Sequence, residues 1–208
     1  MEKRCFIFGA GEYSPLIATP AEGDIVIAAD GGQTLCELLG VTPTLVIGDF
    51  DSSPEPAFDT DVIILPVVKD DTDLIYSVKY GLSEGCREFH IYGGTGGRLD
   101  HTVGNLQALL YIANRGGEGY LYGNGITATI IKNGSFSFIP EGVISVFAFG
   151  SEAHGVTVRG GEYEALDITL KPEFPLGVSN HTLGKEVTAS VEDGAILIMW
   201  EVPNGAES

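Results

Sequence analysis

Hydrophobic residues follow two rhythms in the first half of the chain. Short, nearly continuous runs indicate buried strands, and between them hydrophobic residues recur every three or four positions, the period of an amphipathic helix. This alternation predicts an α/β fold, a doubly wound and mostly parallel sheet that binds ligands beyond the carboxyl ends of its strands. The expected strands are Cys5 to Phe8, Asp24 to Ala29, Thr44 to Ile47, Val62 to Leu65 and Phe89 to Tyr92. The helical positions are Leu35, Leu38 and Leu39, then Leu74, Val78 and Leu82, then Leu99, Val103, Leu106 and Leu110.

The pattern changes after Gly116. Helical spacing gives way to short β-branched and aromatic runs between turn residues, which predicts strands, and Asn133-Gly134 and Asp193-Gly194 favour tight hairpin turns. We expect two closely packed domains, residues 1–117 with the α/β sheet and residues 118–208 with an all-β sandwich or open barrel. The expected strands are Gly119 to Tyr122, Thr127 to Lys132, Ser135 to Ile139, Val143 to Phe149, Gly155 to Val158, Leu166 to Leu170, Glu186 to Val191 and Ala195 to Trp200.

The chain has 208 residues, of which 44% are hydrophobic, and a formal net charge of −18. This length allows a core in each domain. The charge argues against nucleic acid and anionic membrane surfaces as partners, because both need a basic face. An anionic substrate would need help from a metal ion. The N-terminal segment MEKRCFIFGAG has too short an apolar run for a signal peptide or a membrane span, so we expect a cytoplasmic protein.

The cysteines and histidines show no metal-binding spacing. Cys5, Cys36 and Cys86 are odd in number and far apart, which indicates buried, reduced thiols. The four histidines lack an HExxH-like pattern, so zinc is not predicted. Carboxylates are then the main candidate ligands for a metal, and such hard oxygen ligands favour magnesium.

The stretch from Gly93 to Asn105 reads GGTGGRLDHTVGN and combines glycines, an arginine, an aspartate and the start of a helix. Glycines let backbone N–H groups approach an anion closely, and Arg98 supplies a fixed fork of donors. The helix that follows directs its positive end to the same place. We therefore predict that this loop binds a phosphate chain.

Three acidic clusters precede this loop, and each follows an expected strand. They are AADGG with Asp30, GDFDS with Asp49 and Asp51, and KDDTD, in which Asp73 is expected to face the cleft. The two carboxylates of GDFDS are suited to hold magnesium together with water and phosphate oxygens. The structural alternative is that these aspartates form turns or precede helices without a catalytic purpose, with Thr72 as the cap of the helix after KDDTD.

In this order and spacing, the segments ADGG, GDFDS, KDxTD and GGxGGRxDHxxxNL resemble those of the thiamine pyrophosphokinase family over the whole chain. The resemblance implies an N-terminal α/β catalytic domain and a C-terminal β-sandwich that binds thiamine. It implies transfer of a pyrophosphoryl group from ATP to the hydroxyl of thiamine with Mg²⁺, giving AMP and thiamine diphosphate. It also implies a homodimer whose thiamine sites involve residues of both subunits.

The same resemblance implies a role for each matching acidic residue and for the arginine. Asp30, Asp49, Asp51 and Asp73 would form the acidic cluster around magnesium and the phosphates, with the last three as metal ligands. Arg98 would hold the phosphate chain. Little covalent work is needed from the protein, because aligning the reactants and neutralising charge on the phosphate oxygens promote the transfer.

Other residues are implied to contact the two substrates. Asp100 would either bind thiamine or assist removal of the hydroxyl proton, two roles that the sequence leaves open. His101 is a second candidate base, although a histidine that starts a helix more often orients its neighbours or acts as a cap. Ser179 and Asn180 would bind thiamine, although the same residues suit an ordinary turn, and Trp200 lies about two residues from the family's aromatic position. The nucleotide pocket would be lined by Gly9, Gly11, Gly93, Gly94 and Thr95.

Two other functions are compatible with parts of this pattern. A phosphoribosyltransferase-like enzyme also uses paired aspartates with magnesium between a strand and a helix, but GDFDS and the second acidic cluster argue against it. A non-catalytic nucleotide or thiamine sensor would not need every acidic and arginine position, yet all of them are occupied here. Replacing Asp51 with Asn would separate an enzyme, which loses turnover, from a sensor, which keeps ligand binding.

Overall fold

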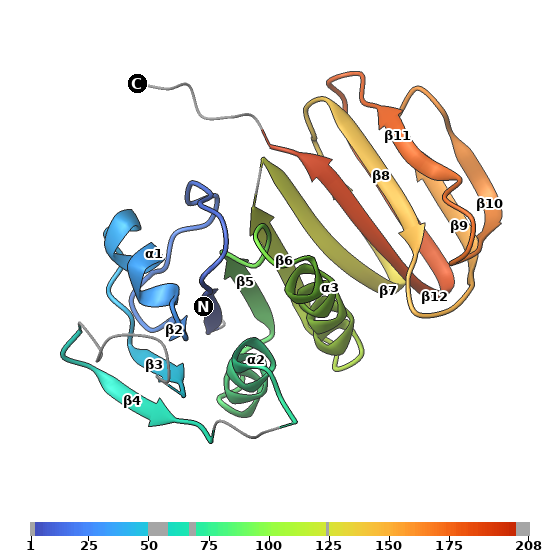
Figure 1. Cartoon of the computed structure of the whole chain (residues 1–208). Helices are drawn as coiled ribbons and strands as arrows, with labels where there is room; N and C mark the ends of the chain where they lie inside the picture. Colours follow the sequence, from blue (N-terminus) through green and yellow to red (C-terminus); the bar gives the residue numbers. More distant parts are fainter. Residues whose placement is uncertain (1–2, 50–57, 67–69, 124, 203–208) are drawn as a thin grey trace. The chain divides into compact units, whose positions relative to one another are not determined.

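The computed structural model of the chain describes residues 3–49, 58–66, 70–123 and 125–202. The chain groups into two compact units, each described separately below (Figure 1). Residues 1–108 and 119–124 form the α/β unit, and residues 109–118 and 125–208 form the β-rich unit. Strand β6 therefore groups with the α/β unit, although it follows the boundary expected at residue 117.

The α/β unit contains one sheet with its strands in the order β6-β5-β1-β2-β3-β4. The five strands from β5 to β4 are parallel to their neighbours, as the sequence predicts. Their carboxyl ends therefore lie at one edge of the sheet, where the predicted loops follow them. The strands are β1 (Arg4–Phe8), β2 (Ile25–Ala29), β3 (Leu45–Gly48), β4 (Asp61–Ile64), β5 (Glu88–Tyr92) and β6 (Glu118–Gly123).

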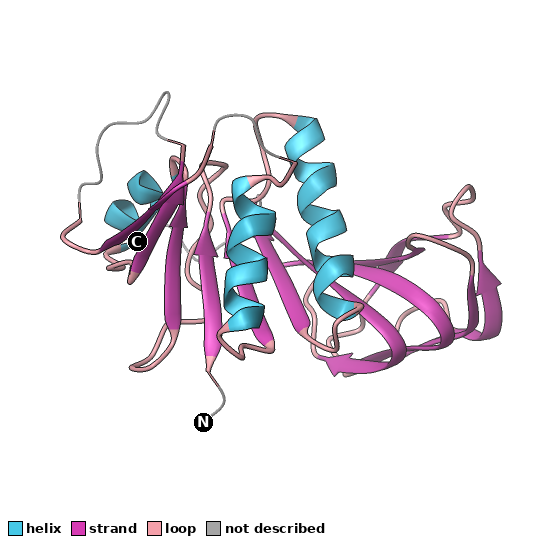
Figure 2. Cartoon of the chain, turned by 90° about the horizontal axis from the view of Figure 1, so that it is seen from below, coloured by secondary structure: helices cyan, strands magenta, loops and turns pink. Residues whose placement is uncertain are grey.

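The three helices are α1 (Gly32–Leu39), α2 (Asp73–Ser83) and α3 (Leu99–Ala113), close to the predicted positions. Thr72 caps α2 as expected, since its hydroxyl accepts a hydrogen bond from the N–H of Ile75 at 3.2 Å. Helix α1 packs on the face of the sheet that carries Phe6 and Phe8. Helix α2 packs on the opposite face, where Gly81 lies against Cys5 and Phe89. Helices thus cover both faces of this sheet (Figures 1 and 2).

Strand β4 differs from the prediction of a buried strand. Its hydrophobic residues are largely exposed, with Ile64 at 73% and Val62 at 39%. The reason is its position at the end of the sheet, where it pairs with β3 on one side. A hydrophobic run does not distinguish a central strand from an edge strand, because this distinction depends on which strands pair.

The β-rich unit is built from antiparallel strands around a hydrophobic core. Strand β12 pairs with β7 along almost its whole length, with β9 through its first half and with β8 through its second half. Strand β11 pairs with β8, and β10 pairs with β9. The core includes Ile144, Val156, Ala189 and Ile196. The strands are β7 (Ile126–Phe138), β8 (Val143–Ala148), β9 (Ala153–Arg159), β10 (Ala165–Leu170), β11 (Gly177–His181) and β12 (Val187–Glu201).

Both predicted hairpin turns are wrong, because Asn133-Gly134 lies inside β7 and Asp193-Gly194 lies inside β12. The two segments face each other across a register shift between Val191 and Ala195. Asn133 and Gly194 have φ angles of 48° and 105°, and the Gly194 N–H donates to Oδ1 of Asn133 at 3.0 Å. Asn-Gly and Asp-Gly supply positive φ angles, which a β-bulge uses as readily as a type I′ turn.

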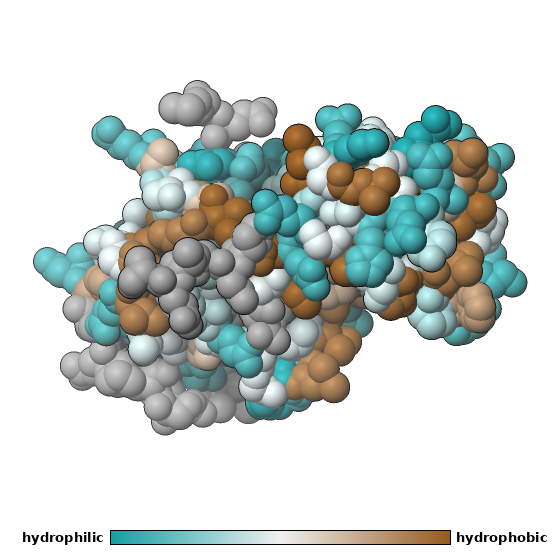
Figure 3. Space-filling view, turned by 90° about the horizontal axis from the view of Figure 1, so that it is seen from above, coloured by the Kyte–Doolittle hydropathy of each residue, from teal (hydrophilic) through white to brown (hydrophobic). Residues whose placement is uncertain are grey.

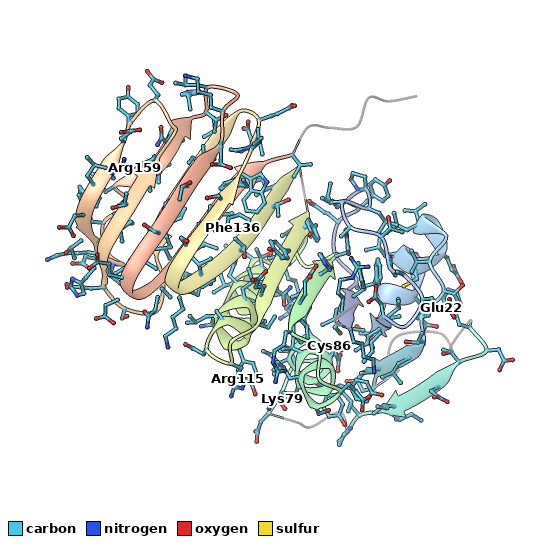
Figure 4. All side chains as sticks on the ribbon, turned by 180° about the vertical axis from the view of Figure 1, so that it is seen from behind. Glu22, Lys79, Cys86, Arg115, Phe136 and Arg159 are labelled. Atoms are coloured by element: carbon cyan, nitrogen blue, oxygen red, sulfur yellow. The ribbon has the colours of Figure 1, made fainter. Side chains whose placement is uncertain are left out.

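Other predictions about side chains can now be compared with the structure. The three cysteines are buried and form no disulfide, as expected, and burial raises the pKa of the Cys36 thiol to about 12. Trp200 packs against Phe138 and Phe136 of β7, with ring centroids 4.6 and 5.9 Å away, and Phe136 is labelled in Figure 4. In the described part of the chain, no helix combines the length and the apolar character needed to cross a membrane.

Candidate active site

Two glycine-containing loops run side by side at the carboxyl ends of β1 and β5. The N–H of Gly11 donates to the carbonyl of Gly93, and the N–H of Glu12 donates to the carbonyl of Thr95, both at 2.8 Å. The backbones approach so closely that a Cβ on Gly11 would overlap the Gly93 and Thr95 carbonyl oxygens. Gly93 also has a φ of 62°, which favours glycine. These glycines therefore fix the geometry of the paired loops.

The second loop, residues 93–97, presents backbone N–H groups with few competing acceptors. Among the described residues, none accepts a hydrogen bond from the N–H of Thr95, Gly96 or Gly97. Two of these three residues, Gly96 and Gly97, are glycines with positive φ and carry no side chain of their own, although the Glu12 side chain packs against Gly96. Successive amides of this kind form a site that binds anions.

Asp30 follows β2 with an unusual backbone. Its φ of 50° lies in the left-handed region, which costs energy for a residue other than glycine. Its N–H donates to the carbonyl of Ile47 at 2.7 Å, and a Cβ on Gly48 would lie 3.2 Å from its Cα. The ends of β2 and β3 are thus packed closely, and Asp49 directly follows Gly48. A strained aspartate at a strand end is typical of functional sites.

Asp73 begins α2, directly after its cap, and is half-buried. An aspartate in the first turn also stabilises the helix dipole, so its position alone does not prove a catalytic role. Asp71, two residues earlier, is paired with a lysine. Its two carboxylate oxygens accept hydrogen bonds from Nζ of Lys79 at 2.7 and 2.6 Å. This contact agrees with the expectation that Asp73, not Asp71, faces the cleft.

Arg98 and Asp100 form an exposed two-point ion pair at the start of α3. Nε of Arg98 lies 3.2 Å from Oδ1 of Asp100, and a terminal guanidinium nitrogen lies 2.6 Å from Oδ2. Oδ1 also accepts a hydrogen bond from the N–H of His101 at 3.0 Å. The hydrogen bonds from Arg98 lower the pKa of Asp100 below its ordinary value, and the same contact raises the pKa of Arg98. The pair is therefore ionised at neutral pH.

These elements line one cavity of about 740 Å³ within the α/β unit, a volume typical of sites for small molecules. The cavity lies at the carboxyl edge of the sheet, where α/β folds bind ligands. It brings together most of the residues predicted there, namely Gly9, Gly11, Asp30, Asp73, Gly93, Gly94, Thr95, Arg98 and Asp100. Asp49 is described but does not line it, and Asp51 lies outside the described residues.

The two residues expected to bind thiamine lie in the β-rich unit, on β11. The side-chain amide of Asn180 binds both backbone groups of Tyr163, accepting from its N–H at 3.0 Å and donating to its carbonyl at 2.7 Å. The N–H of Ser179 donates to Oγ of Ser145, and its φ is 58°. Asn180 also lines a mostly apolar cavity of about 470 Å³ in the same unit.

The cavity wall includes residues that were not predicted to be part of the site. Thr72 and Leu74 flank Asp73, and Gly104 and Asn105 come from the second turn of α3. Nδ2 of Asn105 donates to the carbonyl of Gly94 at 2.7 Å. Asn105 ends the stretch GGTGGRLDHTVGN, but its position in the sequence does not show that its side chain points toward the loop.

The described residues contain no group of three or more His, Cys, Asp or Glu side chains placed to hold a metal ion. Three carboxylates, Asp30, Asp73 and Asp100, nevertheless line the anion-accepting cavity, and Asp100 is paired with Arg98. Magnesium is bound in proteins by one or two carboxylates and completes its shell with water and substrate phosphates. The donor set therefore fits magnesium bound together with a phosphate substrate.

A parallel sheet with a glycine-lined, anion-accepting cavity at its carboxyl edge defines a phosphate-binding α/β protein. The model of "Thiamin pyrophosphokinase, catalytic domain" matches residues 20–120. A thiamine pyrophosphokinase of Bacillus subtilis (strain 168) is 28% identical, with 86% of this chain and 87% of that protein covered. The chain is thus similar to thiamin pyrophosphokinases, and residues 20–120 are similar to their catalytic domain.

Solved structures share the fold over nearly the whole chain. The thiamine pyrophosphokinase from Bacillus subtilis has a TM-score of 0.84 at 24% identity, covering 96% of this chain and 99% of that one. The thiamin pyrophosphokinase from Candida albicans has a TM-score of 0.79 at 14% identity, covering 97% and 89%. At these identities the likeness concerns the fold, which extends to the β-rich C-terminal part.

Proposed function

We propose that the protein transfers the pyrophosphoryl group of ATP to the hydroxyl of thiamine. The thiamine hydroxyl oxygen attacks the β-phosphorus and gives up its proton to solvent, the bond from that phosphorus to the α–β bridging oxygen breaks, and AMP leaves as thiamine diphosphate forms. The observation that carries this proposal is the cavity in which a loop of available N–H groups meets Arg98 and three carboxylates. A phosphate chain needs such donors, and its charge needs a cation.

We assign the phosphate chain to the paired loops at β1 and β5. The backbone of Gly93, Gly94 and Thr95 would hold its oxygens, and Gly9 and Gly11 keep the neighbouring loop close enough to fix this geometry. Arg98 would exchange part of its contact with Asp100 for a phosphate oxygen when the nucleotide binds. Its exposure, 71% of the side chain, leaves it free to reorient.

Magnesium would be held by Asp73 together with Asp49 and Asp51, with Asp30 close to the phosphates. When bound, the ion would neutralise charge on the phosphate oxygens. This assignment is supported by the position of Asp30 and Asp73 on the cavity wall and by the suitability of carboxylate oxygens for this ion.

We propose that Asp100 contacts the cationic thiamine rather than acting as the base. Its pKa is lowered by Arg98, and a carboxylate with a low pKa is a weak proton acceptor at neutral pH. The β-rich unit would be a sandwich domain that contributes Ser179 and Asn180 to thiamine binding, in a cytoplasmic homodimer with sites shared between subunits. Because the Asn180 amide already binds Tyr163, its part would be to shape the site.

The test is an incubation of the purified protein with ATP, thiamine and magnesium, followed by chromatography of the nucleotides and thiamine esters. AMP and thiamine diphosphate should appear in equal amounts. ADP with thiamine monophosphate would indicate a simple kinase. Folded protein that binds MgATP but forms no product would contradict the proposal and favour a sensor.

A further inference from the structure

Three consecutive carbonyl groups of the phosphate loop, those of Gly93, Gly94 and Thr95, are held by other parts of the α/β unit. The carbonyl of Gly93 accepts from the N–H of Gly11, and that of Thr95 accepts from the N–H of Glu12, both at 2.8 Å. The carbonyl of Gly94, between them, accepts from Nδ2 of Asn105 at 2.7 Å. Three consecutive carbonyl dipoles are thereby occupied, while the N–H groups of the loop remain available to a ligand.

Asn105 is the only one of these three donors that acts through its side chain, since Gly11 and Glu12 donate their backbone N–H groups. A carbonyl oxygen only accepts hydrogen bonds, so the group of Asn105 that faces it must be the NH₂. Gly94 has little freedom to move elsewhere, because a Cβ there would overlap Leu121 and lie 3.3 Å from Ile91. The Gly94 peptide is therefore held between the sheet on one side and Asn105 of α3 on the other.

We propose that Asn105 is a positioning residue that sets the orientation of the phosphate loop before the nucleotide binds. This inference rests on the proposed function. In a trans peptide the carbonyl of Gly94 and the N–H of Thr95 point in opposite directions. By holding the carbonyl toward α3, Asn105 turns the N–H of Thr95 away from the helix and keeps a negative dipole away from the phosphates.

The experiment replaces Asn105 with Asp, which has nearly the same shape but accepts instead of donating. The carboxylate repels the Gly94 carbonyl, so this peptide should turn. Titration calorimetry should show binding of MgATP and of magnesium tripolyphosphate weakened by about tenfold or more in each case, the effect of one lost hydrogen bond. The KM for MgATP should rise similarly, whereas the KM for thiamine should stay within about twofold.

A matched control is Asn114→Asp, which adds the same charge beyond the far end of α3. Asn114 is exposed and accepts a hydrogen bond from Nζ of Lys132, which an aspartate can still do. This variant should bind both ligands like the wild type. An equal loss in both variants would show that the added charge alone weakens binding and would overturn the inference.

Asn105→Ala provides a second test without a new charge, and it decides the outcome if Asn105→Asp does not fold. It should weaken tripolyphosphate binding in the same direction with an unchanged melting temperature. Wild-type affinity in a folded Asn105 variant would overturn the positioning role. Turnover of thiamine by the wild type is measured in parallel, so that its absence contradicts the proposed function separately.

Discussion

The contact between Arg98 and Asp100 gives each residue a different chemical character from an isolated side chain. The guanidinium is already paired when the nucleotide arrives, and the carboxylate has a lowered pKa because of that pairing. A residue that must stay negative at neutral pH suits the binding of a cation better than the removal of a proton. This difference can be measured.

Asp100→Asn should raise the KM for thiamine by about tenfold or more, because a hydrogen bond to a charged group contributes about 1.5–3 kcal/mol. In the wild type, protonation of Asp100 should reduce kcat/KM for thiamine only below pH 3.8. This is the ordinary pKa of an aspartate, and the pKa of Asp100 is lowered from it. Steady-state kinetics of both proteins across pH provide the check.

Asp61→Asn is the matched control for this change. Asp61 is exposed at the start of β4, at the opposite end of a parallel strand from the carboxyl edge, so its variant should keep wild-type kinetics. An acid limb near pH 6–7 that disappears in Asp100→Asn would instead assign the role of base to Asp100.

His90 is a buried titratable group outside the cavity. Its ring nitrogens lie 2.9 Å from the Tyr122 hydroxyl and 2.7 Å from Oε1 of Glu88, and it stacks on Phe6. Burial lowers its pKa below the ordinary value of 6.5, although Glu88 acts in the opposite direction. Just below pH 6.5, His90 is therefore still neutral in the folded protein, whereas the same histidine is already largely protonated in the unfolded chain.

The free energy of unfolding should accordingly fall as the pH drops below 6.5, because the unfolded state binds more protons there. The loss is about 1.4 kcal/mol for each unit by which folding lowers the pKa. Urea unfolding at pH 7 and pH 5 should show a smaller pH effect in His90→Gln than in the wild type. A variant of the exposed His181 should retain the wild-type effect, and an equal pH effect in all three proteins would contradict this assignment.

The helices and central strands could be predicted because their local patterns and tertiary roles agree. Leu74 and Val78 are both buried, as helical spacing requires, and Thr72 is the cap that its sequence position suggests. Strand β11 was not predicted, because glycine, serine and asparagine are common in turns and residues such as Gly177 and Asn180 pair with β8 only in the folded unit. Long-range pairing overrides local propensity in such segments.

The bulge between β7 and β12 allows a test of how tertiary contacts, rather than local sequence, decide the role of a glycine. Gly194 has a φ of 105°, and a Cβ there would lie 2.7 Å from the carbonyl oxygen of Glu152. Gly194→Ala should therefore lower the free energy of unfolding by about 1–3 kcal/mol. Gly134, on the facing strand, meets only the Lys132 carbonyl oxygen at 3.6 Å, an ordinary contact. Gly134→Ala should change stability by less than about 1 kcal/mol, as denaturant titration of both variants can show.

The candidate site was predictable to a similar extent. Parallel strands place their carboxyl ends together, which is why Asp30, Asp73 and the loop from Gly93 could be assigned to one cleft. The hydrogen bond from Asn105 to Gly94 could not be assigned, since it depends on how α3 packs beside the loop. The sequence therefore predicted which charged residues share the cleft, and the structure was needed to show that Asn105 contacts the loop.

The surface of the chain combines hydrophobic and hydrophilic areas, as the face in Figure 3 shows, and hydrophobic side chains such as Leu176 and Leu166 are more than half exposed. The chain as a whole carries a formal net charge of −18. The field of such a protein repels anions, and among the described residues that line the cavity the loop amides and Arg98 oppose this repulsion. A free nucleotide therefore meets an unfavourable field that a bound divalent cation reduces.

We therefore expect MgATP to bind much more tightly than ATP in the presence of EDTA. A ligand at about 100 times its Kd stabilises a protein by about 2.7 kcal/mol, so MgATP should raise the melting temperature by several degrees. ATP with EDTA, and magnesium alone, should each produce a much smaller shift at the same concentrations. Equal shifts by ATP with and without magnesium would show that the amides and Arg98 suffice for the phosphates. The carboxylates on the cavity wall would then act on thiamine or on the chemical step rather than on nucleotide binding.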